Sequence, residues 1–171
     1  NGIDLYYESH GDDSAPAIIF AHGRGGNHLS WWQQVAVFSG EYRCITFDHR
    51  GWGDSIAEQG TPLRENFIQD LTDLLDHLKI DKAFLVAQSM GGFACLGFAL
   101  AHPERTLGLV LGDTTGGVAT EGTLAELDKA TPPPDGPARS LSASFINEQP
   151  ALTFLYQQIN DLNPHRGEDG V

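Results

Sequence analysis

The sequence predicts an α/β fold built on an open, doubly wound, mostly parallel sheet. Apolar segments of strand length alternate along the chain with segments of helical periodicity, an order typical of a parallel sheet covered on both faces. Short polar or glycine-rich motifs directly follow four of the expected strands. The chain has 171 residues, 40% hydrophobic and 19% charged, which is enough for one domain with a buried core.

The first part of the chain contains three expected strands and one helix. Residues 3–9 alternate in character and are rich in tyrosine, which favours a strand. Residues 17–21 are continuously apolar, as expected of a central strand in a parallel sheet. Residues 31–38 are predicted to form a short helix, and residues 42–47 the next strand.

A longer amphipathic helix is predicted next, with Thr61 as its N-cap and Pro62 at its first position. Its apolar residues recur at spacings of three and four and predict one buried stripe, made of Leu63, Phe67, Leu71, Leu74, Leu75 and Leu78. Asp70 lies off that stripe, which places it on the polar side of the helix.

Two further strands flank a hydrophobic helix. Residues 82–86 predict a buried strand, and residues 93–102 predict a buried helix that Pro103 ends. Residues 107–112 predict another buried strand.

The composition changes after Gly117. Residues 121–129, 141–148 and 151–162 are predicted to be helical, and the proline-rich segment 131–137 separates the first of these helices from the others. This change favours a boundary between residues 1–117 and residues 118–171.

Polar motifs begin at the carboxyl ends of four expected strands, at residues 22–27, 48–55, 88–92 and 113–117. In an open parallel sheet these ends lie along one edge, where ligands bind. We therefore expect a functional site at this edge, formed by loops that are far apart in the sequence.

Ser89 lies on the tight turn between a predicted strand and a predicted helix, with small residues at Ala87 and Gly91. This pattern is typical of a nucleophile elbow, which exposes a serine hydroxyl above the sheet. Ala87 replaces the first glycine of the usual G-x-S-x-G, a change that keeps the residue small. The alternative interpretation is a serine that only caps the following helix.

Acyl transfer through a serine also requires N–H donors for the developing oxyanion. The backbone N–H of Met90 is one candidate, and the loop that follows the strand at 17–21 offers the backbone N–H of Arg24. His22 and Gly23 begin that loop, and Gly23 leaves room for it to approach the serine. The alternative is a partial dinucleotide-binding fingerprint, whose third glycine is replaced by His28.

Three motifs together resemble those of the α/β-hydrolase superfamily, in its cap-bearing branch of esterases, lactonases and carbon–carbon bond hydrolases. Residues 22–26 (HGRGG) are similar to the family's oxyanion loop, residues 48–55 (DHRGWGDS) to its D-x-R-G-x-G-x-S segment, and residues 88–92 (QSMGG) to its elbow. The resemblance implies that residues 1–117 are the N-terminal part of a hydrolase core. It also implies that residues 118–171 are part of a helical cap.

The resemblance implies a serine hydrolase that cleaves a small ester, lactone or activated carbonyl compound through an acyl-enzyme on Ser89. A non-catalytic binding or receptor module on the same fold is the alternative. The expected order is serine, acid, histidine. Asp113 ends the strand after the elbow and is a candidate acid, against a role as a loop anchor. Asp48, Arg50 and Asp54 are expected to organise their loop.

No histidine after Ser89 fits the role of base. His102 lies at the far end of the same predicted helix, roughly 20 Å away at 1.5 Å per residue, and His165 follows no predicted strand. We therefore expect a truncated fold, with the histidine and main acid beyond Val171 and weak or no activity of the 171-residue chain. A C-terminal partner chain or a homo-oligomer is expected to cover the open sheet edge.

The net charge of −13 argues against partners that are nucleic acids or anionic membranes, and leaves a small molecule as the expected substrate. Cys44 and Cys95 lie in predicted buried elements without metal-ligand spacing, so two free thiols, no metal and no cofactor are expected. Free thiols and the absence of a visible signal or membrane-spanning segment favour a cytoplasmic location.

Overall fold

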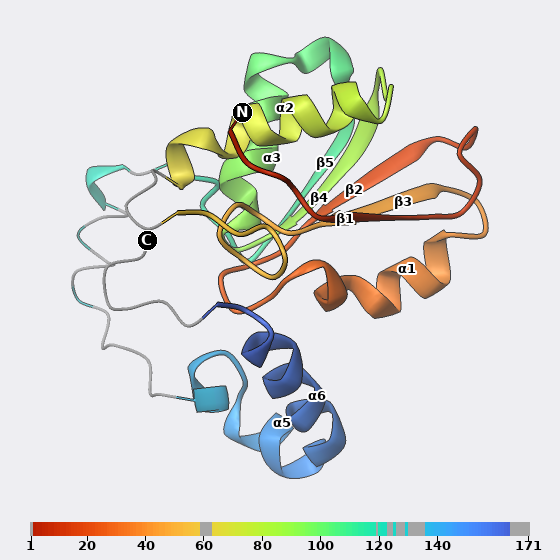
Figure 1. Cartoon of the computed structure of the whole chain (residues 1–171). Helices are drawn as coiled ribbons and strands as arrows, with labels where there is room; N and C mark the ends of the chain where they lie inside the picture. Colours follow the sequence, from red (N-terminus) through yellow and green to blue (C-terminus); the bar gives the residue numbers. More distant parts are fainter. Residues whose placement is uncertain are drawn as a thin grey trace.

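The computed structural model contains one five-stranded sheet, and it describes residues 2–58, 63–118, 120–122, 125, 129 and 136–164 (Figure 1). The strands are β1 (Tyr7–His10), β2 (Ala17–Ala21), β3 (Arg43–Phe47), β4 (Ala83–Gln88) and β5 (Thr106–Gly112). Their order across the sheet is β1-β3-β2-β4-β5. β1 is antiparallel to β3, and all other neighbours are parallel, so the predicted mostly parallel α/β sheet is confirmed.

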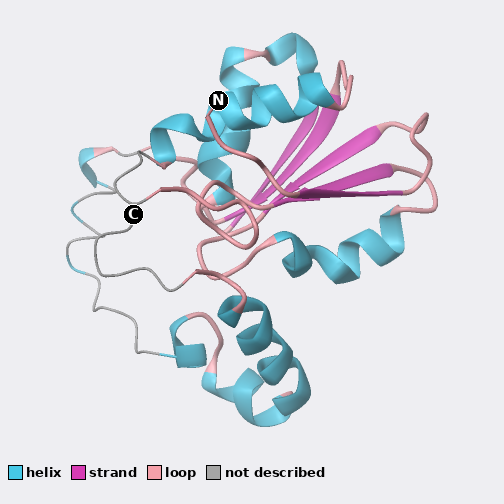
Figure 2. Ribbon diagram, in the orientation of Figure 1, coloured by secondary structure: helices cyan, strands magenta, loops and turns pink. Residues whose placement is uncertain are grey.

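Helices cover both faces of the sheet (Figure 2). On one face lie α2 (Phe67–His77) and α3 (Gly91–Ala101). On the other lies α1 (Trp32–Phe38), preceded by the 3₁₀ turn η1 (His28–Trp31). The C-terminal part contains η4 (Gly136–Arg139), α5 (Ala143–Glu148) and α6 (Pro150–Asp161), and two further 3₁₀ turns are η2 (Arg64–Asn66) and η3 (Pro103–Arg105). No helix in the described ranges is long and apolar enough to cross a membrane.

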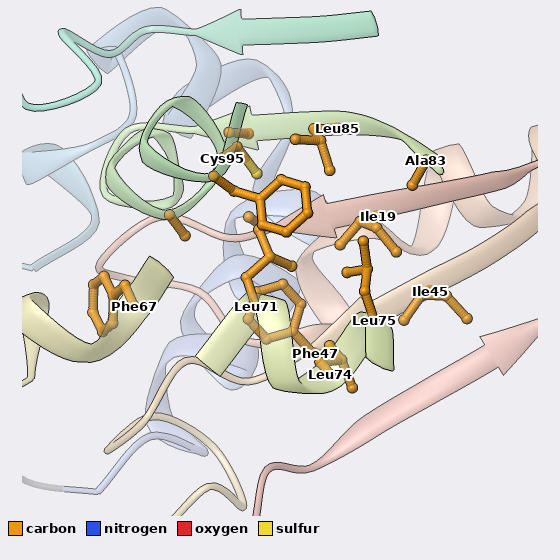
Figure 3. Close-up of a cluster of buried hydrophobic side chains, with 14 of the residues drawn as sticks. Ile19, Ile45, Phe47, Phe67, Leu71, Leu74, Leu75, Ala83, Leu85 and Cys95 are labelled. Carbon is orange, nitrogen blue, oxygen red and sulfur yellow. The ribbon is translucent and has the colours of Figure 1, made fainter. Parts of the chain in front are cut away.

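The main core lies between the sheet and the pair α2 and α3 (Figure 3). Inward side chains of β2, β3 and β4 pack there against the apolar stripe of α2, through Ile19, Ile45, Phe47, Leu85, Phe67, Leu71, Leu74 and Leu75. The stripe predicted from the sequence is therefore confirmed in its central part. The helix begins later than expected, at Phe67 after η2, and the predicted cap Thr61 and Pro62 lie outside the described residues.

Asp70 differs from its expected position on the polar side of α2. It is only 2% exposed, because the guanidinium of Arg50 binds its carboxylate with two hydrogen bonds. Arg50 comes from the loop after β3, and it is also only 2% exposed. This ion pair fixes the loop to α2, and the expectation of a polar helix face fails at this position because a buried partner is present.

β5 is not the buried strand that its composition predicts. It pairs only with β4 among the described strands, and three of its side chains are substantially exposed: Leu107 by 47%, Val110 by 57% and Leu111 by 39%. An apolar strand is buried only where neighbours cover it. In this chain β5 forms an open, apolar sheet edge.

The C-terminal helix α6 lies beside the loops that follow β2 and β3, and α5 packs against α6. Asn27 Nδ2 donates a hydrogen bond of 2.8 Å to the carbonyl of Ile159 in α6, and Gly53 N–H donates one of 3.0 Å to Asn163 Oδ1. The helices predicted over 141–148 and 151–162 are thus confirmed, with slightly different ends. The helix predicted over 121–129 lies largely outside the described residues.

Candidate active site

The loops at the carboxyl ends of the parallel strands meet at one edge of the sheet. Four residues each directly follow one of the strands β2, β3, β4 and β5, in that order: His22, Asp48, Ser89 and Asp113. Because the strands run parallel, these ends lie together although the residues are far apart in the sequence.

Ser89 occupies a strained turn between β4 and α3. Its φ angle is 47°, in the left-handed region that non-glycine residues rarely adopt. The turn is held on both sides: Ser89 N–H donates to the Gly112 carbonyl at 3.0 Å, and the Gly92 N–H donates to the Ser89 carbonyl at 3.0 Å. This strand–turn–helix geometry is that of a nucleophile elbow.

The loop after β2 lies directly against the elbow. A Cβ atom on Gly23 would lie 1.9 Å from Gln88 Oε1 and 3.3 Å from Ser89 Cβ, so any larger residue here would require the Gln88 side chain to move and would crowd Ser89. The loop thereby brings its backbone next to the serine.

The peptide unit that joins Gly23 to Arg24 is held by its carbonyl group. Gly23 O accepts hydrogen bonds from Gly26 N–H at 3.0 Å and from His22 Nδ1 at 2.8 Å. In a trans peptide the N–H points opposite to the carbonyl, so both bonds orient the N–H of Arg24. The next carbonyl, of Arg24 itself, accepts from Trp52 Nε1 at 2.7 Å. The loop is therefore held on two consecutive peptide units, as preorganised donors require.

His22 is a buried, neutral part of this support. Burial lowers its pKa to about 4, outweighing the hydrogen bond to Gly23 and the charge of Asp48. Its Nε2 accepts from the His49 N–H at 3.0 Å, so the proton lies on Nδ1, which donates to Gly23. His22 therefore supports the loop after β2 through its hydrogen bonds and does not line the pocket beside Ser89.

The charged residues after β3 hold their own loop. The carboxylate of Asp48 accepts from the His28 N–H, from His28 Nδ1 and from the Asp54 N–H, at 2.6, 2.9 and 2.9 Å. Burial raises the pKa of Asp48. These hydrogen bonds and the charge of His28 lower the pKa by a larger amount, so the result is below the usual value of an aspartate. A Cβ on Gly53 would collide with this carboxylate at 2.1 Å. Asp48 and Arg50 are thus both engaged within the fold, in the way expected of loop-organising residues.

A pocket of about 230 Å³ opens beside the elbow. Its lining brings together the predicted nucleophile, both predicted oxyanion donors and the candidate acid with four further residues. The members are Arg24, Arg64, Ser89, Met90, Phe93, Asp113, Thr114 and Thr115. Met90 is 4% exposed and is the N-cap of α3, so its N–H belongs to the positive end of that helix.

Asp113, like Ser89, has a positive φ angle. Its φ angle is 50°, and it directly follows β5, one strand away from the nucleophile. It lines the pocket, yet no hydrogen bond joins it to Ser89 within the described part of the chain. Its role as acid stays a prediction.

No histidine lines the described pocket. His102 is the C-cap of α3, at the end of the helix opposite Ser89, as expected from its spacing, and His165 lies outside the described residues. Cys44 and Cys95 are buried free thiols, as predicted. Within the described ranges no cluster of three or more residues has the arrangement of a metal site.

Sequence reasoning missed two features of the site. Arg64 and Phe93 line the pocket, but neither belongs to a motif, and Arg64 reaches it only through the turn before α2. The second feature is the position of α6, a predicted helix whose Tyr156 hydroxyl would lie 2.9 Å from a Cβ on Gly25. Thr114 and Thr115 could have been found, because they immediately follow Asp113 at a strand end.

Comparison with known proteins gives a consistent result. A family model described as the alpha/beta hydrolase fold matches residues 16–137. The chain is 34% identical over 120 residues to a 3-oxoadipate enol-lactonase of Acinetobacter baylyi, covering 70% of this chain and 45% of the relative. It is 37% identical over 113 residues to an epoxide hydrolase of Siraitia grosvenorii, covering 64% of this chain and 35% of the relative.

Solved structures show the same likeness. The crystal structure of an enol-lactonase from Burkholderia xenovorans LB400 superimposes with a TM-score of 0.77 at 27% identity, covering 94% of this chain and 65% of that protein. The chain thus spans less than half the length of these curated relatives and less than two thirds of the solved enol-lactonase. A truncated version of the fold is consistent with this share.

Proposed function

The chain belongs to the alpha/beta hydrolase fold family, and we propose that it is the nucleophile-bearing part of a serine hydrolase. Its substrate would be a small ester, lactone or activated carbonyl compound. Ser89 Oγ attacks the carbonyl carbon, and the N–H groups of Arg24 and Met90 hold the resulting oxyanion. The bond to the leaving group then breaks and leaves an acyl group on Ser89, which water removes.

The observation that carries this proposal is the backbone of Ser89. A φ of 47° on a serine is a strained conformation that a simple helix cap does not require, since capping residues are extended. The strain is maintained by a ladder bond to Gly112 and by close packing of Gly91 on β2. Such strain is typical of functional sites, where it presents a side chain to a ligand.

The oxyanion donors come from two rigid parts of the fold. Met90 begins α3, and the Arg24 peptide is fixed by the two hydrogen bonds to Gly23 O. Donors held before the reaction stabilise developing charge without reorganisation, which is worth roughly 3–4 kcal/mol per donor in serine hydrolysis. The relatives named as lactonases support the same class of chemistry.

The proton of the Ser89 hydroxyl needs a base. No histidine lines the pocket formed by the described residues, and this observation favours the second candidate, a ligand-binding module on the hydrolase fold. In the catalytic proposal Asp113 orients a histidine supplied to this pocket, either by further polypeptide or by a partner chain. The two candidates differ in turnover.

Hydrolysis of p-nitrophenyl acetate by the chain separates them. We expect slow turnover above the buffer rate that Ser89→Ala lowers and that Ser144→Ala, at an exposed serine in α5, leaves unchanged. Oxyanion donors and binding alone leave catalysis of about 10³-fold over water even when the serine and its base are both removed, so the part of the rate that depends on Ser89 is the quantity compared. Equal rates for the wild-type chain and Ser89→Ala would favour the binding module.

A further inference from the structure

Arg64 brings a positive charge to the pocket beside Ser89 in an acidic protein. The pocket lining also contains one carboxylate, Asp113. The whole chain has 10 Lys and Arg residues against 23 Asp and Glu residues. A cationic side chain beside a hollow attracts anions, and at this position its charge opposes the overall composition.

Arg64 is held in place by an aromatic ring. Its guanidinium carbon lies 4.3 Å from the centre of the Phe93 ring, and both residues line the pocket. This cation–π contact holds the guanidinium at the pocket wall without using an acidic partner. A planar row of N–H donors matches the two oxygens of a carboxylate.

Arg64 also differs from other arginines of the chain in its partners. Arg43, Arg50 and Arg105 each form an ion pair with an aspartate, at Asp13, Asp70 and Asp76 respectively. Arg64 forms no ion pair within the described residues, although it is next to a pocket that contains Asp113. Its charge is therefore available to a ligand.

We propose that this pocket binds an acyl group that ends in a carboxylate, with Arg64 as the residue that recognises it. The inference rests on the proposed function, because the substrate's carbonyl group is placed at Ser89 and its carboxylate at Arg64. The volume of about 230 Å³ is below the roughly 300–1,000 Å³ of drug-sized sites, so the ligand is small. Asp113 on the same wall favours one negative charge over two.

Binding of two matched esters tests the proposal without requiring turnover. Monomethyl glutarate carries one carboxylate, and dimethyl glutarate has the same acyl chain with a neutral ester in its place. Both are titrated into the 171-residue chain and followed by amide NMR. Because only the monoanion can form a charge-assisted pair with Arg64, it should bind about tenfold more tightly, which corresponds to about 1.4 kcal/mol.

Three variants locate the effect. Arg64→Gln should bring the two dissociation constants to within about twofold, while Arg64→Lys, which keeps the charge and loses the fork, should retain part of the preference. Arg139→Gln removes one positive charge from η4, outside the pocket lining, and should leave the preference intact. Equal binding of the two esters, or a preference that Arg64→Gln does not change, would overturn the proposal.

The same samples keep this inference separate from the proposed function. Ser89-dependent hydrolysis of dimethyl glutarate without any preference for the monoanion would refute carboxylate recognition and support the hydrolase. A preference for the monoanion that depends on Arg64, without Ser89-dependent hydrolysis of either ester, would support carboxylate recognition and refute the hydrolase.

Discussion

Gly91 in the first turn of α3 lies against the backbone of Ala21 at the end of β2. A Cβ atom on Gly91 would be 2.3 Å from the Ala21 carbonyl oxygen, and backbone atoms cannot move aside as a flexible side chain can. This contact sets how closely the elbow approaches the strand that leads into the loop of Gly23 and Arg24. The position of Ser89 relative to Arg24 depends on it.

Gly91→Ala is therefore expected to destabilise the chain, although alanine is the better helix former. Overpacking against a backbone typically costs about 1–3 kcal/mol in the free energy of unfolding. Urea denaturation measures the change. Gly40→Ala is the matched control, because a Cβ on Gly40 would have no neighbour within 4 Å. Equal midpoints for both variants would show that the contact is not close.

The buried ion pair between Arg50 and Asp70 gives a second prediction. Asp70→Asn replaces the carboxylate that binds the guanidinium of Arg50 at a site that is 2% exposed, and breaking such a pair typically costs about 3–5 kcal/mol. The thermal midpoint should fall by many degrees. Asp81→Asn, an exposed aspartate, should leave it nearly unchanged. A small shift for Asp70→Asn would mean that the loop is anchored by its other contacts.

Buried neutral histidines predict a loss of stability in acid. Burial lowers the pKa of His22 to about 4, from an ordinary value near 6.5, and places that of His49 well below 6.5. The folded state then binds fewer protons than the unfolded state, so stability is complete above pH 6.5 and falls between pH 6.5 and 4. At about 1.4 kcal/mol per pKa unit, His22 alone accounts for roughly 3 kcal/mol.

His28 acts in the opposite direction at higher pH, whereas the lowered pKa of Asp48 adds to the loss of stability in acid. Burial of His28 lowers its pKa. The hydrogen bond to Asp48 and the charge of Asp48 raise the pKa by a larger amount, so the result is above the usual value of a histidine. Its contribution is present below pH 6.5 and is lost as the pH rises through the raised pKa. Stability should therefore be greatest near pH 6.5–7, with weaker losses on the alkaline side.

His49→Phe isolates the acid-side effect. His49 packs among the rings of His22, Phe47 and Phe67, and its Nε2 has no hydrogen-bond partner in the described structure. Phenylalanine fills the same space and does not titrate, so urea denaturation from pH 4 to 7 should show a shallower loss. His77→Gln, at an exposed histidine, should leave the slope unchanged. An unchanged slope in His49→Phe would contradict the assignment of the loss to His49.

The open edge at β5 predicts self-association or capture of a partner segment. Unpaired apolar strands at a sheet edge are templates for further pairing, and Val110 and Leu111 are 57% and 39% exposed. Sedimentation velocity should show mass increasing with concentration, and Val110→Lys should shift the chain toward monomer. A monomer at all concentrations without the substitution would show that this edge is protected.

Much of the site could be predicted from the sequence because its signals are local. Ser89 follows a strand-like run and precedes a helical one, and glycine at position 23 marks a close backbone approach. These constraints involve neighbours in the chain or the parallel order of the strands. The structure accordingly brings Arg24, Ser89, Met90 and Asp113 into one pocket.

Other features depend on partners that no local pattern indicates. Asp70 has the sequence environment of a solvent-facing residue, and only the distant Arg50 explains its burial. Asn27 binds the Ile159 carbonyl across 132 positions of the sequence. β5 has the composition of a buried strand, and its exposure depends on which segments cover it.

The acyl-enzyme on Ser89 can be tested directly by mass spectrometry. The chain is incubated with excess p-nitrophenyl acetate, quenched in acid and measured intact and after proteolysis. We expect one added acetyl group on the peptide that contains Ser89, and none on that peptide in Ser89→Ala. An unmodified Ser89 peptide, or acetylation spread over surface lysines at equal levels in both proteins, would contradict the assignment of Ser89 as the nucleophile.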